Sequence, residues 1–450
     1  MQIIHQAPLS ALGLGAAFTV IWGVADPMAA FAEVRMYTGV GKCAMGDLVS
    51  PAQAKNYARE LAMQNAREQA GVYLTNYTRT TNTKLSAKEI TAISNNITEV
   101  VGEVSYTQTP GEVNGVPVVV YMATLQANVD TEGIKKYLAQ GEKERVAIVQ
   151  QSNESERNIK ASLTQIEKLN EEYGKASSEQ EKEKIRQEFS EADRRLLAEQ
   201  KNREGMALYY KKDYTGAVKL YRQAIDLDQK YASPWNNIGD AYDNLGNYDK
   251  SIECLRKAID LDPKLAEAWN NLGVAYYHLG NYSKAVEYYR KAIDLAPKDA
   301  VQWSNLGTAY NDLGNYDKGI ECLYKSADLD QKFAAPWSNM GDAYNRLGNY
   351  EKAIECCRKA IKLDPDNAFS WNNLGYAYNS LKKYEKAIEC CKKAIELDPG
   401  LARAWENLSV SYYCLGRYNE ALEAIDQSLK LDPDNETVRN NRAYLLQAMG

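Results

Sequence analysis

The stretch Trp269-Asn270-Asn271-Leu272-Gly273-Val274-Ala275-Tyr276 decides the fold of this chain, because it returns 34 residues later as Trp303-Ser304-Asn305-Leu306-Gly307-Thr308-Ala309-Tyr310. Tryptophans keep the same 34-residue period throughout the C-terminal part: Trp235, Trp269, Trp303, Trp337, Trp371 and Trp405. A fixed period of this length is typical of one helical unit copied in tandem, since no single copy can bury its apolar face alone. The sequence therefore predicts a stack of helical repeats.

The repeated phrase resembles the tetratricopeptide repeat (TPR), a helix–turn–helix unit whose stacks bind peptides and proteins. When each tryptophan is set at repeat position 4, seven copies run through 198–231, 232–265, 266–299, 300–333, 334–367, 368–401 and 402–435. A final helix over 436–450 is expected to close the stack. The predicted fold class is an α-helical superhelix (an all-α solenoid), preceded by a small α+β domain and a charged helical linker.

Small residues and turn residues support this repeat pattern. Position 8 is expected to be small so that the two helices of a unit can approach, and it is Gly205, Gly239, Gly273, Gly307, Gly341, Gly375 and Ser409. A glycine also follows most first helices, where a left-handed cap favours a residue without a Cβ. Lys212 and Lys382 replace this glycine in copies one and six. We therefore expect strained turns there.

The resemblance implies that ligands lie on the concave face made by the first helices, mainly at positions 2, 5, 6, 9 and 12. Position 6 is asparagine in six successive copies: Asn237, Asn271, Asn305, Asn339, Asn373 and Asn407. Each amide can donate and accept hydrogen bonds, so such a row can hold the backbone of an extended peptide. The alternative is that these asparagines are ordinary residues of near-identical copies.

Positions that vary between copies carry more information about a ligand. The candidates for peptide binding at positions 9 and 12 are Tyr277, Asp342, Tyr376 and Tyr413. Position 5 contains no lysine: Asn236, Asn270, Ser304, Ser338, Asn372 and Glu406. A ligand held by its terminal carboxylate is therefore disfavoured, and an extended or helical protein segment fits better.

Composition excludes several classes of function. The net charge of −6 argues against a nucleic-acid partner, which usually requires a basic surface. His5 and His278 are the only histidines, so histidine-based triads and histidine-rich zinc sites are excluded. No motif for a phosphate, a nucleophile or a metal is present, so we expect no cofactor, no small-molecule substrate and no enzymatic activity.

Residues 1–32 are predicted to be a signal peptide. Residues 8–25 are apolar and uncharged, and Ala30-Phe31-Ala32 is a cleavage pattern before Glu33. No Lys or Arg precedes the apolar run, which leaves an uncleaved membrane anchor as the alternative. Either reading places the protein in the periplasm or cell envelope of a bacterium, and a cytosolic protein is the remaining alternative.

Residues 33–130 are predicted to form the α+β domain, in the order β-α-β-α-β-β. The expected elements are strands over 33–43, 72–80, 100–109 and 116–129, and helices over 51–70 and 86–94. Gly71 is expected to stop the first helix. This order resembles the small envelope domain of LPP20-type lipoproteins and of the flagellar assembly protein T.

Residues 131–197 are rich in Lys, Glu, Gln and Ser. Ile159, Leu163 and Ile166 follow a helical spacing, which continues at Ile185 and Phe189 after a break at 174–178. This pattern predicts an antiparallel helical pair. It is either a coiled coil through which the chain dimerises or a solvated spacer in front of the repeats.

The cysteines fall mainly inside the repeats: Cys254, Cys322, Cys356, Cys357, Cys390, Cys391 and Cys414. Because they occupy positions that are apolar in other copies, we expect them to be small core residues rather than a disulfide or metal site. The sequence as a whole favours an exported scaffold that binds protein segments in its groove. The alternative is a structural envelope protein that assembles through its N-terminal domain and coiled coil.

Overall fold

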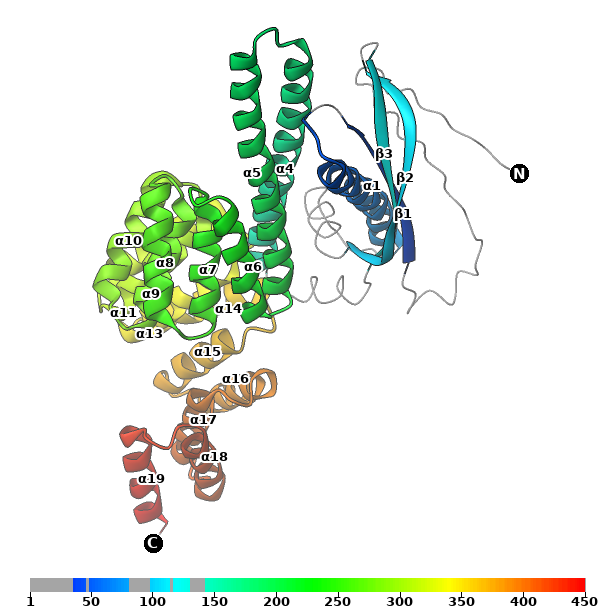
Figure 1. The fold of residues 1–450 in the computed structure, drawn as a ribbon. Helices are drawn as coiled ribbons and strands as arrows, with labels where there is room; N and C mark the ends of the chain where they lie inside the picture. Colours follow the sequence, from blue (N-terminus) through cyan, green and yellow to red (C-terminus); the bar gives the residue numbers. More distant parts are fainter. Residues whose placement is uncertain (1–34, 46–47, 81–97, 114–115, 130–141, 450) are drawn as a thin grey trace. The chain divides into compact units, whose positions relative to one another are not determined.

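The structure is a computed structural model that describes residues 35–45, 48–80, 98–113, 116–129 and 142–449 (Figure 1). The predicted leader over 1–32 and the predicted helix over 86–94 lie outside these residues. Contacts divide the chain into two units, Met1–Pro234 and Trp235–Gly450. Each unit is described by itself.

The N-terminal unit contains an antiparallel sheet in the order β1-β3-β2. Its strands are β1 (Arg35–Met45), β2 (Thr98–Val113) and β3 (Val116–Val129). β2 and β3 pair from Thr98 opposite Val129 to Val113 opposite Val116, as the predicted hairpin requires. β2 includes Pro110, which the sheet tolerates because β2 is an edge strand.

Among the described residues, α1 (Pro51–Thr80) is the helix that follows β1, and it packs against the sheet. The sequence prediction of a helix stop at Gly71 and a strand over 72–80 is wrong, because α1 continues through both. An interior glycine costs a helix only about 1 kcal/mol relative to alanine, and local strand propensity is readily overridden by context. Among the described residues the order is therefore strand, helix, strand, strand.

The charged segment forms a helical pair, α4 (Glu142–Lys175) and α5 (Glu179–Tyr210), as predicted (Figure 1). The side chain of Ser178 caps α5 by accepting a hydrogen bond from the Glu181 amide. α5 runs through residue 198 without a break. The second helix of the charged linker and the first helix of copy one are therefore one continuous helix, α5. It is followed by α6 (Tyr214–Leu227).

The apolar side of this pair is buried inside the N-terminal unit. Ile166 and Phe189 share one core with Ala58 of α1 and Leu125 of β3. This packing differs from both readings of the sequence, because the spaced apolar residues contact the α+β domain instead of water or a second copy. We therefore find no exposed apolar seam for dimerisation among these residues.

A buried ion cluster joins α1 to α5. Both Glu60 oxygens accept hydrogen bonds from the Arg203 guanidinium, at 2.7 and 2.8 Å, and Arg67 adds a contact of 3.3 Å. Burial opposes the ionisation of Glu60, but the two guanidiniums outweigh it and hold the pKa of that carboxyl well below its usual range. The α+β domain and the first repeat copy are thus held together by charge as well as by apolar packing.

The C-terminal unit is an array of helix pairs. The first helices of the pairs are α7 (Ala232–Asn244), α9 (Ala266–His278), α11 (Ala300–Asp312), α13 (Ala334–Arg346), α15 (Ala368–Ser380) and α17 (Ala402–Cys414). The second helices are α8 (Tyr248–Leu261), α10 (Tyr282–Leu295), α12 (Tyr316–Leu329), α14 (Tyr350–Leu363), α16 (Tyr384–Leu397) and α18 (Tyr418–Leu431). The array ends with α19 (Glu436–Ala448), so the all-α solenoid is confirmed.

In six of the seven copies, a glycine at position 8 lies against the side chain at position 24. A Cβ on Gly307 would lie 2.6 Å from Leu323, and one on Gly341 would lie 2.5 Å from the Cys357 sulfur. Real Cβ atoms do not approach other atoms this closely, so the predicted requirement for a small residue is confirmed.

Turns between the helices also agree with the sequence. The glycines after the first helices have positive φ angles, for example +74° at Gly348. Lys212 and Lys382 adopt the same left-handed conformation, with φ of 64° and 59°. Because this region is unfavourable for a residue with a Cβ, both turns are strained as predicted.

Tryptophans link neighbouring copies in a way that the sequence analysis missed. The Nε1 atom of Trp303 donates to the Pro297 carbonyl at 2.9 Å, and Trp371 does the same to Pro365. Where Gln331 replaces the proline, Trp337 is not seen to form this bond within the described chain. Its ring instead lies 4.3 Å from Lys359 Nζ.

Candidate functional site

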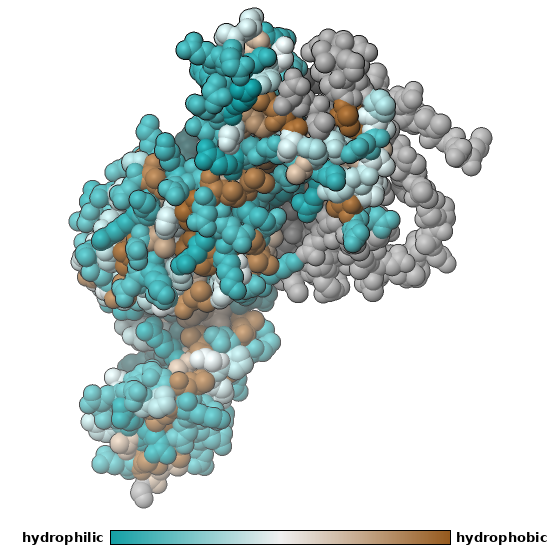
Figure 2. All heavy atoms as spheres, in the orientation of Figure 1, coloured by the Kyte–Doolittle hydropathy of each residue, from teal (hydrophilic) through white to brown (hydrophobic). Residues whose placement is uncertain are grey.

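The first helices of successive copies lie next to one another in the C-terminal unit. α9 contacts α11, α11 contacts α13, α13 contacts α15, and α15 contacts α17. Side chains at positions 2, 5, 6, 9 and 12 of these helices form the surface that we call the groove. On the face visible in Figure 2, the repeats are mostly hydrophilic with small apolar groups between the polar ones.

The position-6 asparagines of the groove bind the preceding copy. The Nδ2 atom of Asn271 donates to Asn236 Oδ1 at 3.1 Å, and Asn305 donates to Asn270 Oδ1 at 3.0 Å. In the same way, Asn407 Nδ2 donates to Asn372 Oδ1 at 2.9 Å. The row predicted from sequence therefore exists, but these amides already donate to their neighbours.

Two members of the row differ from this pattern. Asn339 donates to the Thr308 hydroxyl at 2.9 Å, because copy four has Ser304 where copies two, three and six have asparagine. Asn373 is half-buried, and its amide forms no hydrogen bond to another described side chain or carbonyl. Asn237, the first in the row, is buried.

A second set of asparagines, at position 12, bonds to the following copy. Asn311, Asn345 and Asn379 donate to the backbone carbonyls of Asn339, Asn373 and Asn407, at 3.3, 2.9 and 2.8 Å. The Oδ1 atoms of Asn311 and Asn345 are buried and have no hydrogen-bond partner among the described residues. The sequence analysis placed these asparagines in the groove but did not predict that they join the repeats.

Two of the variable candidate residues form hydrogen bonds to other side chains of the C-terminal unit. Tyr277 donates from its hydroxyl to Asp312 Oδ2 at 2.5 Å, and Asp342 accepts from Arg346 Nε at 2.8 Å. Burial and the Asp312 carboxylate both raise the pKa of Tyr277 far above its usual value, so it remains a hydrogen-bond donor. These pairs keep the middle of the groove polar.

The other two variable candidates, Tyr376 on α15 and Tyr413 on α17, present exposed rings. The structure adds Phe369 at position 2 of α15, which is 60% exposed, and Tyr444 on α19. Sequence analysis missed this pair, although Tyr444 falls at position 9 when the repeat count is continued into the last helix. The exposed aromatic side chains of the groove thus gather in its C-terminal half.

Family models called tetratricopeptide repeat match residues 236–300, 303–333, 334–367, 368–401 and 402–435, and one called TPR repeat matches 205–246. The chain belongs to the tetratricopeptide repeat family. The TPR fold is typically a non-enzymatic scaffold for protein–protein interaction, and TPR proteins commonly bind protein or peptide partners.

Several solved TPR structures are similar to part of this chain. YrrB, described as a TPR protein with an unusual peptide-binding site, is 22% identical, and the match covers 42% of this chain and 96% of YrrB with a TM-score of 0.35. A TPR protein from Parabacteroides merdae is 15% identical over 56% of this chain and 99% of its own, with a TM-score of 0.47. PilF of Pseudomonas aeruginosa is 19% identical over 48% and 98%, with a TM-score of 0.42. No curated protein matches the chain.

Cysteines in the TPR array behave mostly as core residues. Six are buried, namely Cys254, Cys322, Cys356, Cys357, Cys390 and Cys391, whereas Cys414 is exposed. Burial raises the pKa of Cys322 to about 11, so its thiol stays protonated at neutral pH. The prediction of core packing is confirmed for the six and wrong for Cys414.

Outside the TPR groove, the described residues offer little for other chemistry. They contain no group of His, Cys, Asp and Glu side chains that could hold a metal ion. In the same part of the chain, no helix has both the length and the apolar character needed to cross a membrane.

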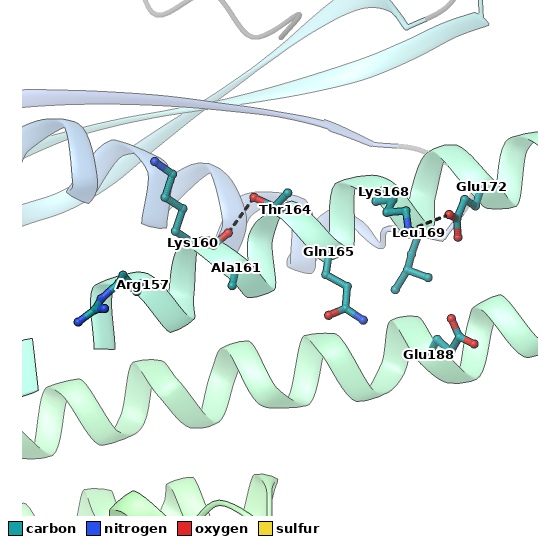
Figure 3. A pocket seen from close by; sticks show the side chains of 9 residues that line it. All are labelled: Arg157, Lys160, Ala161, Thr164, Gln165, Lys168, Leu169, Glu172 and Glu188. Carbon is teal, nitrogen blue, oxygen red and sulfur yellow. Dashed lines mark hydrogen bonds and ion pairs between the residues drawn. The ribbon is translucent and has the colours of Figure 1, made fainter. Parts of the chain in front are cut away.

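A hollow of about 630 Å³ lies on the α4–α5 pair (Figure 3). Its lining includes Lys168 and Glu172, which form an exposed ion pair at 3.4 Å, and Thr164, which donates to the Lys160 carbonyl. The lining is Arg157, Lys160, Ala161, Thr164, Gln165, Lys168, Leu169, Glu172 and Glu188. This mixture of opposite charges is typical of a solvated helix surface.

Proposed function

We propose that this TPR protein is an exported, non-enzymatic scaffold that binds protein or peptide segments in its groove. The observation that carries the proposal is the set of exposed aromatic side chains on adjacent first helices, with Tyr376 on α15 and Tyr413 on α17. Rigid aromatic rings supply a large contact area at a low entropic cost, which makes them frequent binding anchors.

Hydrogen bonds between the copies that carry these rings support the same proposal. Asn379 and Asn407 already bond to neighbouring copies, so the helices that carry the rings are fixed relative to one another. A fixed surface binds with a smaller loss of conformational entropy than a mobile one. In this account, the asparagines build the groove and the aromatic residues contact the ligand.

Capture of cellular partners tests this proposal. The full chain is compared with a groove variant that combines Tyr376→Ser, Val410→Ser and Tyr413→Ser. The matched control combines Leu295→Ser and Leu363→Ser, which change exposed apolar residues at the ends of second helices. We expect the groove variant alone to lose its partners, and equal capture by both variants would contradict the groove.

Export is supported by the apolar stretch over 8–25 and by Ala30-Phe31-Ala32 before Glu33. N-terminal sequencing of the mature protein checks this part of the proposal. We expect the mature chain to begin at Glu33, and a chain in the cytosol that retains residues 1–32 would contradict export.

A further inference from the structure

One junction of the array differs from the others in the residues that join neighbouring copies. Position 28, near the end of the second helix, is isoleucine or leucine in six copies: Ile225, Ile259, Ile293, Ile361, Ile395 and Leu429. In copy four it is Ala327, which is buried on α12. Copy four also has Gln331 at position 32, where five copies have proline. Both replacements fall at the junction between copies four and five.

Isoleucines at position 28 contribute to the packing between copies elsewhere in the array. Ile293 of copy three shares a buried core with Leu306 of copy four. Ile361 of copy five packs against the core that contains Leu374 of copy six. Alanine has far fewer atoms to pack than isoleucine, and dispersion attraction is the sum of such contacts. The junction that follows Ala327 is therefore held by weaker apolar packing near the α12–α13 connection.

The tryptophan hydrogen bond is also absent from this junction. In four copies the tryptophan Nε1 donates to the carbonyl of the preceding position-32 proline at 2.9 to 3.1 Å: Trp269, Trp303, Trp371 and Trp405. Among the described residues, no such bond joins Trp337 to Gln331. Proline fixes its own φ and so restricts the direction of the connection, whereas glutamine does not. Trp337 instead meets the Tyr324 ring edge-on, with the ring centroids 5.9 Å apart.

The same replacement accompanies a division of the chain at another place. Gln229 is the other glutamine at position 32, and the Nε1 atom of the following Trp235 is buried with no hydrogen-bond partner among the described residues. The boundary between the two units falls between these residues, directly after Pro234. A missing tryptophan bond thus coincides with a boundary between structural units.

The junction between copies four and five keeps contacts in the middle of its helices. Leu323 of α12 and Met340 of α13 share one core. Asn339 donates to the Thr308 hydroxyl, and Asn311 Nδ2 lies 3.3 Å from the Asn339 carbonyl. The equivalent bonds to the carbonyl at the next two junctions are shorter, at 2.9 and 2.8 Å. These central contacts provide a pivot, while the residues next to the connection are the least constrained.

We propose that the junction between copies four and five is a hinge, about which copies two to four and copies five to seven move as two stiff halves. Both halves retain the tryptophan bonds and the position-28 isoleucines that the hinge lacks. Motion at the hinge changes the angle between the part of the groove at Tyr277 and the part at Tyr376. The inference goes beyond the proposed function, because the motion belongs to the free array and its test requires no ligand.

Pairs of spin labels in the full chain measure this motion. Position 30 is exposed in copies three, five and seven, at Leu295, Leu363 and Leu431. Labels attached there through p-acetylphenylalanine leave the native cysteines unmodified. The Leu295–Leu363 pair spans the hinge, and the Leu363–Leu431 pair spans an equal length of the array without it.

Double electron–electron resonance gives the distribution of distances for each pair. We expect the distribution for Leu295–Leu363 to be at least about twice as broad as that for Leu363–Leu431, since a hinge between the labels adds to their relative motion. Equal widths for the two pairs would overturn the inference.

Two double variants assign the hinge to the named residues. Ala327→Ile with Gln331→Pro restores the residues of the other copies and should narrow the Leu295–Leu363 distribution to the width of the control pair. Ile395→Ala with Pro399→Gln gives the junction between copies six and seven the residues of the hinge and should broaden the Leu363–Leu431 distribution about two-fold. The second variant decides the question if isoleucine overpacks at position 327. A Leu363–Leu431 distribution that stays narrow in that variant would overturn the assignment.

Discussion

Asn407 donates a hydrogen bond from Nδ2 to the Oδ1 atom of Asn372, 2.9 Å away in the preceding copy. Equivalent bonds join Asn271 to Asn236 and Asn305 to Asn270. A row that resembles a ligand site in sequence is thus part of the interface between repeats. We expect these bonds to stabilise the stack of repeats.

This role predicts that Asn407→Ala lowers the free energy of unfolding. We expect a loss of about 1 kcal/mol, the usual net contribution of one hydrogen bond. Urea unfolding of the full chain, followed by tryptophan fluorescence, measures it because Trp235 to Trp405 all lie in the repeats. Asn373→Ala is the matched control, and it should lower the free energy of unfolding by clearly less than Asn407→Ala does. Equal costs would contradict a structural role for the bond.

Close packing between position 8 and position 24 predicts that Gly341→Ala destabilises the array. The new Cβ would lie 2.5 Å from the Cys357 sulfur, and overpacking of this kind costs roughly 1–3 kcal/mol. Adding Cys357→Ala removes the sulfur and should recover most of the loss. A double-mutant cycle by urea unfolding measures the coupling. Strictly additive effects of the two substitutions would contradict this packing.

The strained turn of copy six predicts that Lys382→Gly stabilises the protein. Lys382 has φ of 59°, a conformation that costs a residue with a Cβ roughly 1–2 kcal/mol. We expect the unfolding free energy to rise by about 1 kcal/mol. The reverse change Gly348→Lys, at a turn with φ of 74°, should lower it by a similar amount. A stabilisation by both substitutions would show that strain does not decide these turns.

Buried Glu199 predicts a pH dependence of the N-terminal unit. Burial raises the pKa of Glu199 to about 7, although the Tyr231 hydroxyl donates to its Oε2 at 2.6 Å. Because the folded pKa is raised, its contribution to stability is complete below roughly pH 4.3 and is lost as the pH rises through about 7. The loss is about 4 kcal/mol in full.

Hydrogen exchange of peptides that cover residues 185–231 measures this effect, since the repeat tryptophans report on the other unit. The protection of backbone amides against exchange should fall between pH 5 and pH 8, after correction for the pH dependence of the intrinsic exchange rate. Glu199→Gln should remove that fall, because it keeps an uncharged acceptor next to Tyr231. A variant with the same pH profile as the parent chain would contradict the assignment to Glu199.

Repetition explains why the array was predictable from sequence. A 34-residue period, with glycine at position 8 in successive copies, repeats the same local signal, so helix bounds follow within each copy. The α+β domain offers each signal only once. Gly71 was therefore read as a helix stop, although α1 continues to Thr80.

The candidate site was predictable in position but not in role. Asn271 and Tyr376 lie on the expected helices, yet only the structure shows that one donates to a neighbouring copy and the other is exposed. Hydrogen bonds between copies depend on the stagger of adjacent helices, which a single repeat sequence does not encode. Tyr444 was missed because α19 lacks the tryptophan that marks a repeat.

Photo-crosslinking in the producing cell tests the binding groove most directly. Benzoylphenylalanine is placed in the full chain at Tyr376 or Val410 of the groove, and at Leu295 or Leu363 on second helices. The groove account predicts crosslinks to the same discrete protein partner from Tyr376 and Val410, and none to that partner from the second-helix positions. Crosslinks from Leu295 and Leu363 alone, or equally from all four positions, would contradict it.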